Sequence, residues 1–99
     1  MFEYWTEDDF ASAFRKMLTI EQFRSEEMQK LYQQYLVAGP ASYVKALFES
    51  IGIVNAKDKA ARFYAVMHFY YSLYDGAADK EKVKVEFVSA IKSLVQELK

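Results

Sequence analysis

Apolar residues recur at helical spacing along most of the chain. Val44, Leu47, Phe48 and Ile51 form an i, i+3, i+4, i+7 stripe, as one face of a helix does. A similar row in residues 80–98 contains Phe87, Ile91, Leu94 and Leu98, and Val88 and Val95 widen it. Glycine, proline and other turn residues fall between segments long enough for helices. They do not separate short segments of alternating apolar and polar residues, as they would between β-strands. The pattern therefore predicts an all-α fold.

Capping residues predict where the first helices begin and end. Thr6 and Asp9 have the spacing of a capping box, which predicts a helix over about 7–17. Its Phe10, Phe14 and Met17 share one face. A short helical turn is expected over 20–24. Ser25 then caps a helix that should end at Gly39-Pro40. The inner face of that helix contains Met28, Leu31, Tyr32, Tyr35 and Leu36.

The second half of the chain also contains residues that typically begin and end helices. Pro40 suits the first position of a helix that Gly52 ends. Asn55 is expected to cap a helix over about 56–74, which Gly76 closes, and Asp79 to cap a last helix over about 80–98. The prediction is five helices and one short helical turn. A length of 99 residues indicates a single domain over 1–99.

The segment RFYAVMHFYYSLYDG, residues 62–76, is apolar on more than one helical face. Phe63, Met67, Tyr70 and Tyr74 fall on one face, and Val66, Phe69 and Leu73 on another. Such a helix is buried all round, either by its own chain or by a second copy on one side. Tyrosine suits an interface because its ring packs while its hydroxyl can stay hydrated. With the wide stripe of the last helix, this favours pairing of two copies as a four-helix bundle.

Charge and composition narrow the functional classes. Thirteen basic and fourteen acidic side chains nearly cancel, which argues against a phosphate-binding surface. The absence of cysteine excludes disulfides and thiolate metal sites. The N-terminal MFEYWTEDD does not resemble a signal peptide, and no apolar run approaches the roughly 20 residues of a membrane span. We expect a cytoplasmic protein with no membrane partner.

His68 is the sole candidate general base or metal ligand. It has no second histidine or cysteine to complete a zinc site, and no nucleophile lies in a catalytic motif. We therefore expect no enzyme activity, no catalytic residue, no metal and no cofactor. Two interpretations of His68 remain: a hydrogen-bonded histidine within or beside a pocket, or a polar contact to a ligand.

Two long segments resemble the C-terminal ligand-binding and dimerisation domain of TetR-like transcriptional regulators. Residues 10–52, FASAFRKMLTIEQFRSEEMQKLYQQYLVAGPASYVKALFESIG, are similar to the middle helices of that domain. Residues 63–98, FYAVMHFYYSLYDGAADKEKVKVEFVSAIKSLVQEL, are similar to its last two helices. No helix-turn-helix segment appears before the similarity. The residues fit either a piece of a longer regulator or a natural stand-alone derivative.

The resemblance implies a homodimer joined through the last two helices, with a small apolar or aromatic effector in a cavity. DNA would be bound only through a helix-turn-helix domain outside these residues. The expected interface residues are Phe63, Tyr70, Tyr74, Phe87, Ile91, Leu94 and Leu98. The candidate ligand-binding residues are Trp5, Phe10, Phe14, Met17, Tyr35, Tyr43, Met67, His68 and Tyr71, although ordinary core packing explains them equally well. The alternative function is a small helical interaction module that pairs with another regulator or protein.

Overall fold

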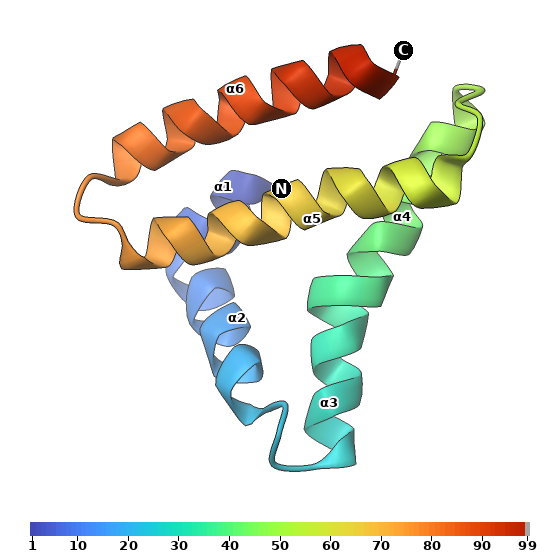
Figure 1. The fold of residues 1–99 in the computed structure, drawn as a ribbon. Coiled ribbons are helices and arrows are strands. Elements are labelled where there is room, and N and C mark those ends of the chain that lie inside the picture. The colour runs from blue at the N-terminus through green and yellow to red at the C-terminus, as the bar shows by residue number, and fades with distance from the viewer. Residues whose placement is uncertain (99) are drawn as a thin grey trace. The chain divides into compact units, whose positions relative to one another are not determined.

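The computed structural model describes the backbone of residues 1–98 and the side chains of residues 1–97. All regular structure in this range is helical, which confirms the all-α prediction. The elements are α1 (Phe2–Glu7), α2 (Asp9–Glu21), α3 (Glu26–Tyr32), the π-helical turn η1 (Gln33–Val37), α4 (Ala38–Ser50), α5 (Ala56–Gly76) and α6 (Lys80–Leu98). Since α3, η1 and α4 follow one another without a break, the described residues form five helices (Figure 1).

The chain divides into two compact units, Met1–Pro40 and Ala41–Lys99. In the first unit, α1 packs against α2 and α2 against α3. In the second unit, α5 packs against α6. The single domain expected over 1–99 stays a prediction.

Buried Arg15 links the first two helices. Its guanidinium Nε donates a hydrogen bond of 3.0 Å to the backbone carbonyl of Trp5, in the last turn of α1. The last carbonyls of a helix have no partner within the helix, and a cation suits their partial negative charge. A buried arginine is thus accommodated because it caps a neighbouring helix.

The core of the first unit lies between α2 and the α3–η1 segment. Leu18, Tyr32 and Leu36 are buried together there, and Trp5, Phe14, Met28, Leu31 and Val37 pack around them. The buried positions of α2 are Ala11, Arg15 and Leu18, a row at i, i+4, i+7. The row predicted to share a face, Phe10, Phe14 and Met17, lies beside this buried row, and Phe10 is 75% exposed.

The first helix cap was assigned to the wrong residue. Asp8, not Thr6, caps α2, and its Oδ1 accepts a 2.8 Å hydrogen bond from the backbone N–H of Ala11. Thr6 belongs to α1, where its hydroxyl donates to the carbonyl of Phe2 at 2.8 Å. Both residue types cap helices, so spacing alone could not distinguish them. As a result α2 begins later than expected. At its other end α2 continues through Glu21, into the predicted turn over 20–24.

Gly39-Pro40 does not end a helix, contrary to the prediction. Ser25 caps α3 as expected, accepting from the N–H of Met28 at 3.2 Å, but the helix continues to Ser50. Proline in a regular α-helix clashes with the carbonyl four residues earlier. Here η1 precedes it, with the Ala38 N–H donating to the Gln33 carbonyl five residues back. This wider turn moves the preceding carbonyls and lets the proline remain in the helix.

Gly52 terminates α4, as predicted. Its φ of 82° places it in the left-handed region. The N–H of Gly52 bonds to the carbonyl of Glu49 and the N–H of Ile53 to that of Phe48, at 3.1 and 3.0 Å. This is a Schellman ending, which satisfies two of the last carbonyls of the helix. Asn55, at φ 57°, precedes α5 as expected but makes no side-chain cap bond.

Helices α5 and α6 form an antiparallel hairpin (Figure 1). The connection is only residues 77–79, and Asp79 caps α6 as predicted, accepting from the N–H of Lys82 at 3.1 Å. The Lys80 ammonium donates a 2.7 Å hydrogen bond to the Tyr74 carbonyl and lies 4.7 Å from the centre of the Tyr74 ring. One lysine therefore stabilises both the end of α5 and the turn.

Replacing Gly39 should disrupt the continuous helix. A Cβ at this position would overlap the backbone carbonyl oxygen of Gln34, which cannot move without opening η1. We expect Gly39→Ala to lower the free energy of unfolding by about 2 kcal/mol or more. Gly76→Ala is the control, because a Cβ there meets no atom within 4 Å, and it should not destabilise the chain. Urea unfolding followed by circular dichroism measures both; equal stability of the two variants would contradict the steric explanation.

Leu18 tests the core of the first unit. Its side chain is fully buried, so Leu18→Ala should cost about 2–5 kcal/mol of unfolding free energy by leaving a cavity. Ile20→Ala removes an aliphatic side chain that is mostly exposed on the same helix and should cost less than about 1 kcal/mol. Thermal and urea unfolding report the difference. Similar losses in the two variants would show that the core is placed wrongly.

Candidate functional site

A row of buried side chains runs the length of α5. Its members are Ala56, Ala60, Tyr64, Met67, Tyr71 and Tyr74. The spacing of three and four residues is that of one helical face. Tyr64 and Tyr71 thus share the buried face with Met67 and Tyr74, whereas the sequence grouped Met67 and Tyr74 with Phe63 and Tyr70.

His68 lies next to this row and is half-buried. Its ring centre is 6.0 Å from that of Tyr64 and 6.1 Å from that of Tyr71. The arrangement suits an aromatic packing role and a ligand contact alike, so both interpretations stay open. Within residues 1–98, no group of three or more histidine, aspartate or glutamate side chains could hold a metal ion.

A second face of α5 contacts its neighbours in the second unit through aromatic rings. Phe63 packs edge-on against Phe48 of α4, with ring centres 5.7 Å apart. Tyr70 packs against Phe87 of α6 at the same distance. Such edge-to-face pairs contribute about 0.5–1.5 kcal/mol beyond the area they bury. They hold the hairpin and the end of α4 together.

A third face of α5 remains exposed and apolar. Phe69 is 58% and Leu73 40% exposed, at i, i+4 on one face. Leu73 also borders a shallow groove of about 500 Å³ with Lys82, Val83 and Glu86 of α6. Between Arg62 and Asp75 the helix has no acidic or basic side chain to cover these positions except His68.

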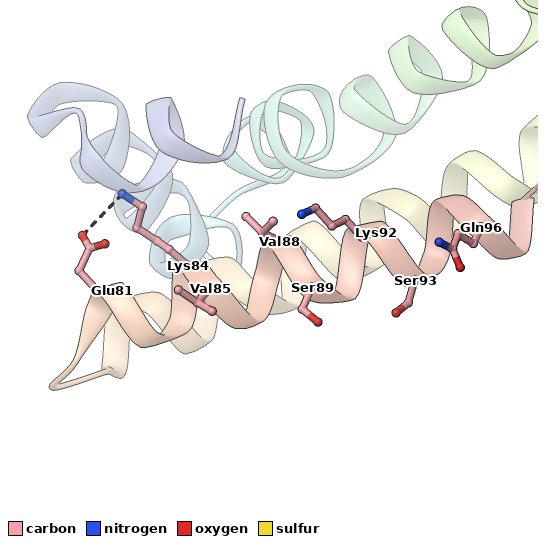
Figure 2. A pocket seen from close by; sticks show the side chains of 8 residues that line it. All are labelled: Glu81, Lys84, Val85, Val88, Ser89, Lys92, Ser93 and Gln96. Atoms are coloured by element: carbon pink, nitrogen blue, oxygen red, sulfur yellow. Dashed lines mark ion pairs between the residues drawn. The ribbon is translucent and has the colours of Figure 1, made fainter.

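Helix α6 has its own exposed apolar residues. Val85, Val88 and Val95 are exposed, and Val88 is 48% accessible. Figure 2 shows Val85, Val88 and Ser89 in the middle of a row along α6. Glu81 and Lys84 lie at one end of this row, and Lys92, Ser93 and Gln96 lie at the other. Glu81 and Lys84 form an ion pair of 3.6 Å in which the Glu81 side chain is 83% exposed, so solvent weakens the attraction.

A groove opens at the opposite end of the second unit, where α4 ends and α5 begins. It encloses about 640 Å³ and is lined by Phe48, Phe63, Val95, Lys59 and the loop residues 51–54. Sequence patterns did not reveal it. The available signal was three large aliphatic residues, Ile51, Ile53 and Val54, clustered around a helix-ending glycine.

The candidate ligand residues divide between the two units. In Met1–Pro40, Phe14 stacks on Phe10 at 6.1 Å and meets Tyr35 edge-on at 5.5 Å, while Trp5 packs at the core. Met17 is exposed there. In the second unit Met67 and Tyr71 are buried, His68 is half-buried and Tyr43 is exposed. Their assembly into one pocket stays a prediction.

The expected interface residues are partly used within the chain. Tyr74 is buried, Phe63, Tyr70 and Phe87 form the ring pairs described above, and Ile91 and Leu94 are half-buried. The side chain of Leu98 lies outside the described residues. Their contact with a second copy stays a prediction, but the more exposed apolar residues of the hairpin are Phe69, Leu73, Val85, Val88 and Val95.

Two further findings bear on function. No helix within the described residues has the length and apolarity needed to cross a membrane. Comparison with protein-family models, curated proteins and solved structures finds no match to this chain.

Proposed function

We propose that the chain is the effector-binding and homodimerisation domain of a TetR-like transcriptional regulator. The proposal starts from the similarity of residues 10–52 and 63–98 to that domain. It places the dimer contact on the α5–α6 hairpin and the effector among the aromatic helices. A fold can carry many functions, so the exposed residues must support the assignment.

The observation that carries the proposal is the apolar surface left on both helices of the hairpin. Phe69 and Leu73 of α5 and Val88 of α6 are exposed even though the two helices already pack on each other. Covering such residues with the same hairpin of a second copy gives a closed, two-fold four-helix bundle. A contiguous exposed apolar surface is typical of an association site, and the proposal requires these residues to form one.

The effector part of the proposal is supported by the aromatic side chains. Met67, His68 and Tyr71 bring an adaptable thioether, an imidazole and a phenol to adjacent positions on α5. Ligand sites in proteins combine apolar walls with a few placed polar groups, and this segment offers both. The absence of paired catalytic groups in the sequence favours binding over turnover.

The same exposed surface also suits the alternative function, an interaction module for a different protein. The two hypotheses differ in what the chain does alone. A homodimerisation domain associates without a partner, whereas an interaction module remains monomeric until another regulator or protein is added.

Charges in the exposed apolar surface should separate the dimer into monomers. We expect Phe69→Asp and Val88→Asp each to weaken self-association by about 3 kcal/mol or more, because a carboxylate would be buried at the interface without a partner. Both positions are exposed within the chain, so each variant should keep its helical circular dichroism. Sedimentation equilibrium over a dilution series measures the association.

Ala61→Asp is the matched control. Ala61 is an exposed position of α5 away from Phe69 and Leu73. This variant should associate like the unmodified chain. A monomeric unmodified chain, or dimers unaffected by both aspartates, would remove the proposed interface. Monomers that form a heterodimer on mixing with another regulator would favour the interaction module instead.

A further inference from the structure

The groove at the start of α5 has the size and lining of a small-molecule site. Its volume of about 640 Å³ lies within the roughly 300–1,000 Å³ typical of ligand pockets. The rings of Phe48 and Phe63 pack edge-to-face in its lining. Val95 of α6 lines the groove as well. The Schellman ending at Gly52 fixes the loop that forms the remaining side.

The loop is unusually apolar for its exposure. Ile51 is 72% and Val54 70% exposed, although turns are normally built from small and polar residues. Neither side chain is needed for the turn itself, which depends on the left-handed Gly52. Their position at the groove suits contact with the apolar body of a bound molecule.

Lys59 gives the groove its polarity. Among the described lining residues it alone is charged. Its acidic neighbour in sequence, Asp58, forms an ion pair of 3.4 Å with Arg62. An ammonium at an otherwise apolar groove attracts a single negative charge attached to a hydrophobic body, and a carboxylate can also accept its hydrogen bonds.

We propose that this groove binds an amphipathic carboxylate, with its head group on Lys59 and its apolar chain against Phe48, Phe63 and the side chains of Ile51 and Val54. The inference does not depend on the proposed function. None of the candidate ligand-binding residues lines the groove. Of the hairpin residues, Phe63 and Val95 line it, but Phe69 and Val88 do not. Loss of the dimer through Phe69→Asp or Val88→Asp would therefore leave the lining of the groove unchanged.

Titration of the full chain with dodecanoate, below its critical micelle concentration, tests the proposal. Calorimetry should show saturable binding, and the backbone amide signals of Gly52, Ile53 and Val54 should shift with the same dissociation constant. Lys59→Gln should weaken binding at least about tenfold through loss of the charge-assisted hydrogen bond. Lys57→Gln, an exposed lysine of the same helix outside the lining, should leave the dissociation constant unchanged.

Two further probes test the charge preference of the groove. Val54→Asp should also weaken dodecanoate binding at least about tenfold, because it puts a negative charge beside the chain and head group. Dodecyltrimethylammonium has the same chain with a cationic head and should bind at least about tenfold more weakly than dodecanoate. Undetectable dodecanoate binding, equal binding of the cation, or equal affinity of Lys59→Gln and the unmodified chain would overturn the proposal. Amide shifts of residues 52–54 on protein dilution alone would assign the groove to a second copy and overturn it too.

Discussion

The second unit depends on one constraint: α5 has too little polar surface to stand alone. From Phe63 to Tyr74 it contains no acidic or basic side chain except His68, so every direction around the helix presents apolar atoms. One face of α5 forms the buried row that includes Tyr64, Met67 and Tyr71. Another face forms the ring pairs with Phe48 and Phe87. The face that contains Phe69 and Leu73 is left exposed. We propose that a second copy covers this face.

The ends of the helices determine how that constraint is met. Lys80 bonds to the last turn of α5 and packs on Tyr74, which holds the three-residue connection and sets α6 alongside α5. The Schellman ending at Gly52 similarly fixes the turn into α5. These local devices leave apolar residues at two places in the unit, the hairpin surface and the groove beside Lys59. We propose that the first binds a second protein surface and the second a small amphiphile.

Sequence reasoning succeeded where local chemistry decides the structure. The bounds of α6, the caps at Ser25 and Asp79, and the helix end at Gly52 all depend on residues within one turn. It failed at Pro40, because the π turn that accommodates proline depends on a register change several residues earlier, which no local rule predicts. It also missed the groove, whose lining comes from α4, α5 and α6. Helical periodicity identifies apolar stripes but does not show which stripe the rest of the chain buries. Sequence alone therefore does not distinguish Phe69, which is exposed, from Phe63, which packs on Phe48.

The most direct test of the account is whether the exposed face of α5 touches a second copy. Mixing isotope-labelled and unlabelled chains and recording isotope-filtered nuclear Overhauser spectra detects contacts between copies only. We expect intermolecular signals from the Phe69 ring and the Leu73 methyl groups to the same hairpin of the other chain. Association that produced intermolecular signals elsewhere but none from these residues, or no association at all, would contradict it.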